Sequence, residues 1–462
     1  MVPGKFCSIY RRSIFQFKVK LHALCQTNSL MTAGNSEDNT YTYTYTHSDF
    51  TFHTSPWEDT SPQQLSKFDL ELHKRWDHAM ATGVFRYNID HIVTRILPGP
   101  KHYVGQLNTL RATERRKPQE ITSVCQPFNP NAFNFTWVKP EEVVFNLRNT
   151  TTLGKKQVRG SVSSALLNGA ANNHTTDCQK DDLVNGHSSE EFINTDVPGK
   201  LKDQPERHTL IVNVSPMEYG HCLLVPQIDS HRPQVLTETA VTVAIETMLL
   251  SKHRGFRMGF NSLCAFASVN HLHFHVYYLE HELIVDYCPV QQLGGKIFEI
   301  TTIPCPGFAL QLHGSSIQEL AKRAHKITTY FHENDIAHNI FMCRGTVFGE
   351  ERNSTLTTLR LYIWPRKKFI GIHNEHFNTE HCVCEGGTEY TCNKSSEEFN
   401  VACIELGGHL PIKEEDGYHK LTEKDVDAII ADACLPSDTY RNIQGAITEI
   451  GVADLQEHSN TQ

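Results

Sequence analysis

The alternation of polar and apolar positions is most regular between Ser268 and Leu279 of the 462-residue chain. Within it His271, His273 and His275 occupy every second position, and the residues between them are apolar. Because successive side chains of a β-strand point to opposite faces, this pattern predicts a strand with one histidine face and one apolar face. A shift of one residue would bury the histidines and expose the apolar set, so the register should be well defined.

The sequence around this strand predicts two units of similar make-up. In the first unit, strands at 209–214 and 221–226 precede a helix around 241–248, a short strand near 259–260 and the histidine strand. The second unit starts with a capping box at 316–319, which opens a helical stripe of apolar residues. Strands are then expected at 339–342, 359–364 and 401–406, before a closing helix at 422–434.

These two units predict an α+β fold with two related halves, each an antiparallel sheet with packed helices. Upstream of them, a helix is expected at 68–80 and strands at 103–108 and 141–147. The stretches 1–60 and 150–205 are polar and should be disordered, because they cannot bury enough apolar surface. The predicted organisation is a disordered N-terminal segment (1–60), the N-terminal part of the catalytic body (65–149), a disordered insertion (150–205), the half that carries the histidines (206–300), the second half (301–450) and a flexible tail (451–462).

Composition narrows the range of partners and locations. The formal net charge of −9 argues against nucleic acid as the main partner, and no apolar run reaches membrane-spanning length. Fourteen cysteines without an even framework point to reduced thiols and a cytoplasmic location. The first 36 residues hold five basic residues and no acidic one, which leaves a transit peptide or a start at Met31 open. Cys382, Cys384 and Cys392 are expected to be loop thiols, with zinc binding as the alternative.

The residues around the histidine strand resemble a known superfamily. The strand is similar to the histidine-triad signature, and the stretches 213–226 and 259–263 resemble the hairpin and the strand that precede the triad there. From about 65 to 450, apart from the insertion, the chain resembles the GDP-D-glucose phosphorylase family and the related plant GDP-L-galactose phosphorylases. The segments that carry this resemblance are 85–87, 96–99, 106–108, 115–118, 133–136 and 141–145.

The resemblance implies a nucleotidyltransferase that converts a GDP-hexose and inorganic phosphate into GDP and a hexose 1-phosphate. His273, the middle histidine, would be the nucleophile and carry GMP covalently. His271 would orient the strand and its neighbour, and His275 would contact the α-phosphate or the bridging oxygen. Asn261 and Ser268 would donate hydrogen bonds to phosphate. No metal and no cofactor are expected, and a homodimer is left open.

Two departures from the related enzymes bear on this interpretation. His275 stands where the plant enzymes and galactose-1-phosphate uridylyltransferases carry glutamine, and a third histidine is usual among triad hydrolases. Cys264 stands where a small glycine is expected. A nucleotide-sugar or dinucleotide hydrolase and a non-catalytic nucleotide sensor therefore remain alternative functions.

Other residues of this region have competing interpretations. The three histidines could instead hold a structural metal or form a packed polar face. His221 is interpreted as a packed residue rather than a catalyst. The basic cluster of Arg111, Arg115, Arg116 and Lys117 fits phosphate or guanine binding as well as a solvated surface. Glu405 and His409 are an alternative metal pair in the second half.

Overall fold

The computed structural model of the chain describes residues 40–151, 206–370 and 398–459. The predicted insertion, apart from its first two residues, lies outside these ranges, as do the candidate transit peptide and Cys382, Cys384 and Cys392. None of the helices within the described ranges combines the length and the apolar character that crossing a membrane requires.

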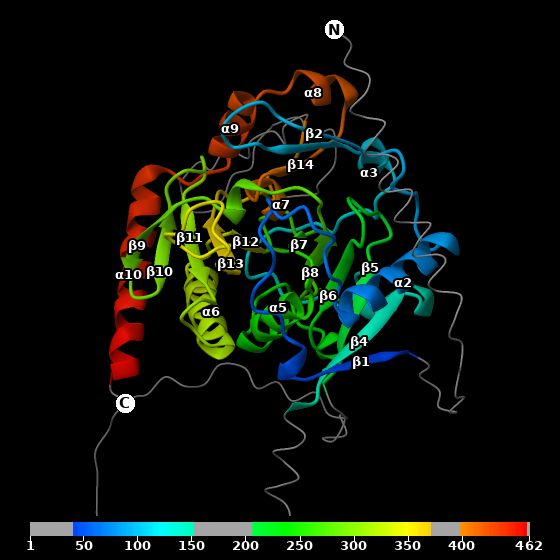
Figure 1. Cartoon of the computed structure of the whole chain (residues 1–462), viewed down its shortest axis with the longest axis horizontal. Coiled ribbons are helices and arrows are strands. Elements are labelled where there is room, and N and C mark those ends of the chain that lie inside the picture. Colours follow the sequence, from blue (N-terminus) through cyan, green and yellow to red (C-terminus); the bar gives the residue numbers. More distant parts are fainter. Residues whose placement is uncertain (1–39, 152–205, 371–397, 460–462) are drawn as a thin grey trace, which may run out of the picture. The chain divides into compact units, whose positions relative to one another are not determined.

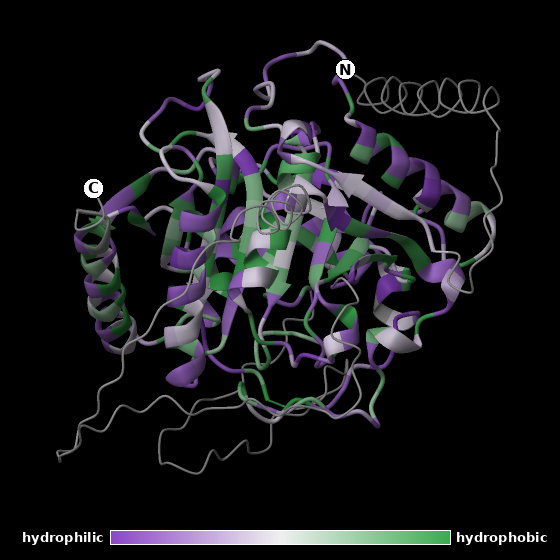
Figure 2. Ribbon diagram, turned by 90° about the horizontal axis from the view of Figure 1, so that it is seen from below, coloured by the Kyte–Doolittle hydropathy of each residue, from purple (hydrophilic) through white to green (hydrophobic). Residues whose placement is uncertain are grey.

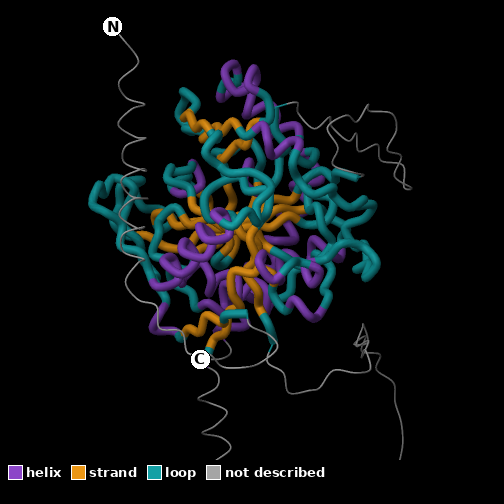
Figure 3. Tube along the Cα trace, turned by 90° about the vertical axis from the view of Figure 1, so that its right-hand side faces the viewer, coloured by secondary structure: helices purple, strands orange, loops and turns teal. Residues whose placement is uncertain are grey.

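A large β-sheet runs through the described chain (Figure 1). Neighbouring strands are antiparallel, except that the outermost strand β1 is parallel to β4. The central strands lie in the interior of the tube drawing, with helices and loops around them (Figure 3). Across the sheet the order is β1 (Thr42–Tyr45), β4 (Val143–Asn149), β5 (His208–Val212), β6 (Cys222–Val225), β8 (Phe274–Tyr278), β7 (Phe256–Asn261), β12 (His338–Thr346), β13 (Thr357–Pro365), β11 (Gly307–Gln311), β10 (Ile297–Ile300) and β9 (Val290–Gly294).

The two central parts of this sheet follow the same plan. In the first, β5 and β6 precede helix α5 (Glu238–Leu250), and β7 and β8 follow it, in the spatial order β5-β6-β8-β7. In the second, β10 and β11 precede helix α6 (Ile317–Glu333), and β12 and β13 follow it, in the order β10-β11-β13-β12. The halves join where β7 pairs with β12, with Asn261 opposite Asn339. The predicted duplicated α+β fold is confirmed.

One face of the sheet is covered by helices. Side chains such as Met258, Phe274, Ile340 and Leu361 pack there against α5, α6, α2 (Lys67–Ala81) and α10 (Ser437–Ser459). Helices α5 and α6 lie side by side, and the strands that they cover are rich in apolar residues (Figure 2). The predicted capping box of α6 is present, because Ser316 Oγ accepts the Glu319 N–H at 3.2 Å and Glu319 Oε2 accepts the Ser316 N–H at 2.7 Å.

The opposite face of the sheet lies beneath a second, smaller sheet. Its strands are β14 (His409–Ile412), β3 (Val104–Leu107) and β2 (Val93–Ile96), and helices α8 (Glu415–Lys420) and α9 (Glu423–Asp432) pack with them. Tyr277, Phe341, Tyr362 and Trp364 of the large sheet point to this side and join the same buried cluster. The remaining elements are α3 (Thr109–Thr113), α7 (Cys403–Leu406) and the 3-10 helices η1 (His47–Asp49), η2 (Phe135–Trp137), η3 (Pro140–Glu142), η4 (Ile228–Ser230) and η5 (Ile284–Asp286).

The start of the ordered chain differs from the sequence prediction. Residues 42–45, within the stretch expected to be disordered, form β1, and Tyr43 and Tyr45 are buried. Tyr45 also donates a hydrogen bond of 2.7 Å to the Glu246 carboxylate of α5. A Thr–Tyr repeat has the period of a strand, so its tyrosines share one face that can enter the core, and the low complexity of the segment was misleading.

Two predicted boundaries in the second half were also wrong. Residues 290–300, assigned to the first half, form β9 and β10 beside β11 of the second half. The predicted flexible tail from 451 is the end of helix α10 as far as Ser459. Asp454 holds it in place, because its carboxylate pairs with Arg323 at 2.9 Å and with Lys326 at 2.8 Å, both on α6.

Candidate active site

The histidine stretch enters the centre of the first half. His275 lies within β8, opposite Gly259 of β7 and Leu223 of β6. The apolar residues Leu272, Phe274 and Val276 belong to the helix-covered core, so the predicted two-faced pattern is confirmed. The predicted strand is too long, however, because β8 begins only at Phe274.

The segment before β8 is held by the loop between β6 and α5. Leu272 N–H donates to the Arg232 carbonyl at 3.0 Å, and His273 N–H donates to Gln234 Oε1 at 2.9 Å. Gln234 is buried, and its Nε2 donates to the carbonyls of Asn261 at 2.9 Å and His273 at 3.1 Å. One side chain thus fixes the backbone on both sides of the site, and nothing in the sequence pattern indicated it.

The hydrogen bonds around His273 determine which ring nitrogen carries its proton. Nδ1 lies 2.7 Å from the His271 carbonyl and 2.9 Å from Gln234 Oε1. Both neighbours are acceptors, so Nδ1 is the protonated nitrogen and Nε2 keeps its lone pair. Burial lowers the pKa of His273 to about 4, so the ring is neutral near pH 7.

His275 has the opposite tautomer. Met217 N–H donates to His221 Nδ1 at 3.1 Å, so a neutral His221 carries its proton on Nε2. That nitrogen lies 3.1 Å from His275 Nδ1, which must accept, while Asn213 Nδ2 is a more distant neighbour at 3.3 Å. His275 therefore carries its proton on Nε2. Burial holds the pKa of His221 and of His275 well below the usual value, which keeps both rings neutral.

His271 resembles His275 in this respect. Its Nδ1 accepts the Phe135 N–H at 3.1 Å, so its proton also lies on Nε2. Burial lowers the pKa of His271 to about 3. Phe135 packs against both His271 and His273, with ring centroids 5.5 and 4.9 Å apart. Of the three rings, only that of His273 has Nε2 unprotonated.

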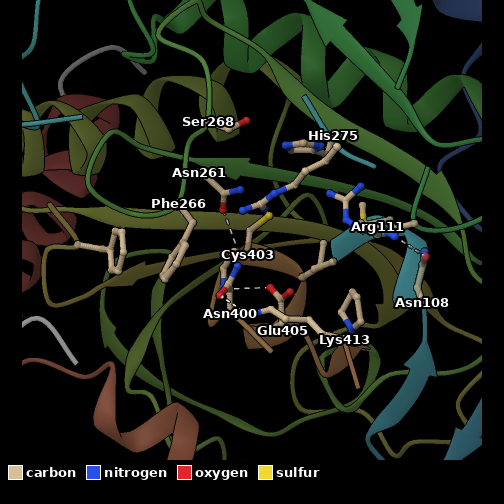
Figure 4. A pocket seen from close by; sticks show the side chains of 16 residues that line it. Asn108, Arg111, Asn261, Phe266, Ser268, His275, Asn400, Cys403, Glu405 and Lys413 are labelled. Carbon is tan, nitrogen blue, oxygen red and sulfur yellow. Dashed lines mark hydrogen bonds between the residues drawn. The ribbon is translucent and has the colours of Figure 1, made fainter. Parts of the chain in front are cut away.

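A cavity opens beside the histidines on the face that the smaller sheet covers (Figure 4). His275, Asn261 and Ser268 line it, as do Arg111 and Arg115 of the predicted basic cluster. His271 and His273 are not among its lining residues, although the His273 ring lies next to that of His275 with centroids 5.3 Å apart. The residues of the predicted basic cluster therefore do not all face the cavity. The Arg116 guanidinium lies over the Phe133 ring instead, 3.6 Å from the ring centroid.

Asn261 joins the two halves at the floor of this cavity. Its Oδ1 accepts hydrogen bonds from Asn339 Nδ2 at 2.7 Å and from Cys403 N–H at 3.0 Å. With its oxygen engaged in this way, the amide nitrogen is the group that Asn261 can direct to a ligand. Asn261 can therefore donate hydrogen bonds, as its predicted phosphate-binding role requires.

The turn after β7 explains one departure from the expected motif. Cys264 has a φ of 59°, and Phe266, which lines the cavity, has a φ of 74°. Both values lie in the left-handed region, where glycine is the least strained residue. Cys264 thus occupies a position whose backbone favours the glycine that the motif led us to expect.

The far wall of the cavity comes from a segment whose structure was predicted wrongly. Residues 401–406 were expected to form a strand, but 403–406 form the short helix α7. A short apolar run does not distinguish a buried strand from a buried helical turn, so the pattern alone was ambiguous. Asn400, Cys403 and Glu405 from this segment line the cavity with Lys413 (Figure 4).

Glu405 is the acidic residue among the described residues that line the cavity. Its side chain is almost fully buried, and Oε2 accepts the Ala402 N–H at 2.9 Å. Burial raises the pKa of Glu405 to about 7, although Arg111 and Arg366 act in the opposite direction. From the sequence alone, Glu405 is indicated only as a candidate metal ligand.

The hydrogen bonds argue against the metal alternatives. His409 has both ring nitrogens engaged, Nδ1 with the Tyr277 hydroxyl at 3.1 Å and Nε2 with Gln106 Oε1 at 2.6 Å. It therefore has no lone pair directed at Glu405. Within residues 40–151, 206–370 and 398–459, no three histidine, cysteine, aspartate or glutamate side chains are grouped so that they could hold a metal ion.

A duplicated antiparallel sheet with a row of histidines in one half is the architecture that the resemblance to the histidine-triad signature predicts. Family models agree with this architecture: one for the GDPGP1-like N-terminal domain matches residues 67–168 and 167–277, and one for the GDPGP1-like C-terminal domain matches residues 279–453. The chain belongs to the GDPGP1-like family.

Individual relatives are similar over most of the chain. GDP-D-glucose phosphorylase 1 from Xenopus laevis is 35% identical, over 87% of this chain and 94% of its own length. The Homo sapiens protein of the same name is 36% identical over 85% of each chain. GDP-L-galactose phosphorylase 2 from Arabidopsis thaliana is 25% identical, over 83% of this chain and 76% of its own length. The crystal structure of yeast Ap4A phosphorylase with AMP aligns with 81% of this chain and 98% of its own, at 13% identity and a TM-score of 0.43.

Proposed function

We propose that this protein is a GDP-hexose phosphorylase that acts on GDP-D-glucose and forms GDP and glucose 1-phosphate. The family relationship supports the reaction, since relatives at 35–36% identity carry the name GDP-D-glucose phosphorylase. The observation that carries the mechanism is the tautomer of His273. Its Nδ1 donates to two oxygens, which leaves an unprotonated Nε2 with a lone pair on a neutral ring.

In the first displacement, Nε2 of His273 forms a bond to the α-phosphorus of GDP-glucose. The bond between that phosphorus and the bridging oxygen breaks, and its electron pair leaves with glucose 1-phosphate. The positive charge that develops on the imidazole is stabilised by the His271 carbonyl 2.7 Å from Nδ1. The Nε2–H of His275 and the amide of Asn261 would donate to the phosphoryl oxygens as charge builds up on them.

In the second displacement, an oxygen of inorganic phosphate attacks the same phosphorus. The N–P bond breaks, its electron pair returns to Nε2 of His273, and GDP leaves. Arg111 and Arg115 place positive charge at the cavity, where it would attract the incoming phosphate. Two displacements each use a good nucleophile, so no step needs an activated water or a metal ion.

The reaction is tested with purified protein and GDP-glucose, with and without phosphate. We expect an acid-labile GMP adduct on His273 by mass spectrometry when phosphate is absent, and GDP with glucose 1-phosphate when it is present. GMP release that does not depend on phosphate would favour the hydrolase, which the third histidine at 275 keeps in consideration. Absence of both adduct and turnover would favour a nucleotide sensor.

Gln234 offers a test of the tautomer argument. Replacing it with alanine removes one acceptor at His273 Nδ1 and leaves buried donors unpaired, so we expect turnover to fall roughly 10- to 100-fold. A Gln234→Glu variant would place a negative charge beside Nδ1 and raise the pKa of His273. The acid limb of its pH–rate profile should then move to higher pH, a change that a purely structural role of Gln234 would not produce.

A cytoplasmic location is part of this proposal. The cysteines in the described ranges form no disulfide bonds, as expected for a protein kept in a reducing compartment.

A further inference from the structure

One wall of the cavity has no role in the proposed displacement steps at phosphorus. The histidines and Asn261 come from the first half and the β7–β12 junction, whereas Asn400, Glu405 and Lys413 come from the second half. In Figure 4 these three side chains lie together, on the side of the cavity away from Ser268 and His275. Lys413 Nζ donates to Asn400 Oδ1 at 3.1 Å, so this wall is internally braced.

The charges around the cavity show what this wall can bind. Arg111, Arg115 and Lys413 are cations, and among the described residues that line the cavity Glu405 is the one acid. A carboxylate repels phosphate oxygens, so it favours a part of the ligand that is uncharged and offers hydrogen-bond donors, which in GDP-glucose is either the guanine base or the hexose. Glu405 has acceptor capacity for such donors, since a carboxylate has about four lone-pair sites and the Ala402 N–H uses one of them.

The direction of attack indicates which part of the ligand this is. In-line displacement places the leaving oxygen on the side of the phosphorus opposite the attacking nitrogen. The His273 ring adjoins that of His275, which lines the cavity, and His273 itself is not a lining residue, so the leaving group departs from it into the open cavity. The leaving group is the hexose 1-phosphate, whose uncharged, donor-rich part is the sugar ring.

We propose that Glu405 binds the hexose of the substrate by accepting hydrogen bonds from its hydroxyl groups, and that it is a specificity-determining residue of this enzyme. The inference rests on the proposed function and extends it to the sugar. Helix α7 positions the carboxylate, because the Cys403 N–H is tied to Asn261 and the Ala402 N–H to Glu405 itself. The second half thus supplies sugar recognition, and the first half supplies the nucleophile.

Two reactions of the same protein separate this role from others. Phosphorolysis of GDP-glucose requires the hexose site. Exchange of radiolabelled inorganic phosphate into GDP passes through the same GMP adduct without any hexose. For Glu405→Ala we expect kcat/KM for GDP-glucose to fall about 10- to 100-fold, the scale for a lost hydrogen bond to a charged group, while the exchange rate stays unchanged.

Glu246 provides a matched control, because it is also a buried carboxylate but lies on α5, away from the cavity. Glu246→Ala should leave both rates per folded molecule as they are. An equal fall of both reactions in Glu405→Ala would mean that Glu405 serves the nucleotide or phosphate, and unchanged rates would mean that it has no ligand; either result overturns the inference. Absence of exchange in the unaltered protein would instead overturn the proposed function.

Substrate analogues keep the inference testable if Glu405→Ala does not fold. With the unaltered protein, GDP-glucose analogues that each lack one hydroxyl should include at least one with kcat/KM reduced to a similar degree. In Glu405→Gln, which keeps the size of the side chain, the same deletion should have a smaller effect because the partner is already weakened. Equal effects of every deletion in both proteins would contradict a contact between Glu405 and the sugar.

Discussion

Replacing His273 with asparagine or alanine should abolish the GMP adduct and reduce the turnover of GDP-glucose by about 10⁴-fold or more, as expected when the nucleophile of a covalent mechanism is removed. The physical reason is specific to this ring. His271 and His275 have their protons on Nε2, so neither can replace the lone pair that His273 presents. Rapid-quench assays of turnover, with mass spectrometry of the adduct, would measure both effects.

His338 is a matched control for this experiment. It is also a buried histidine with its pKa lowered to about 4 by burial, and its Nδ1 faces the carbonyl two residues earlier, that of Ile336, at 3.2 Å. It does not line the cavity. His338→Asn should therefore retain turnover per folded molecule. If His273→Asn keeps the turnover of the unaltered protein while remaining folded, His273 is not the nucleophile.

Acidification should destabilise the protein strongly between pH 7.5 and 5.5. Burial lowers the pKa of His271 and His409 to about 3 and that of His273 and His338 to about 4. An unfolded imidazole takes up a proton as the pH falls through 6.5, whereas these folded rings do not until the pH approaches 4. Each should then remove about 1.4 kcal/mol of unfolding free energy over that interval.

Buried acids act in the opposite direction but on a smaller scale. Burial raises the pKa of Glu405 to about 7, so its folded form binds a proton before its unfolded form does and offsets about one histidine. Urea unfolding at pH 7.5, 6.5 and 5.5 should therefore show a net loss of several kcal/mol. His338→Asn should have a shallower pH dependence by the contribution of one histidine. An unfolding free energy that does not change over this range would contradict the neutral, desolvated state of these rings.

The sequence predicted those parts of the site in which local pattern and burial agree. The alternation at His271, His273 and His275 gave the correct faces, because a strand that is buried on both sides has a fixed register. The start of β8 was not predictable. It depends on the hydrogen bond from the His273 N–H to Gln234, which lies 39 residues earlier in a loop. That contact is tertiary and leaves no periodic signal in the sequence.

The errors elsewhere have similar causes. The run from Val401 to Leu406 was apolar enough for a strand, and only its packing against Asn261 reveals that it is the turn of α7. The tail beyond 451 was judged by its polarity, yet Asp454 extends α10 by pairing with two cations of α6. In both cases a distant partner decides the local structure, as tertiary context often does for short segments.

In the second half, β13 corresponds to β8 but carries different side chains. On the face where β8 presents its histidines, β13 presents Arg360, Tyr362 and Trp364, all fully enclosed. In an assembly of two identical copies, any substitution would alter both reaction centres at once. Joining the copies in a single polypeptide removes that constraint. One half could then keep the nucleophilic histidine. The other half could fill the corresponding position with bulky side chains and change its remaining residues to bind the leaving hexose 1-phosphate.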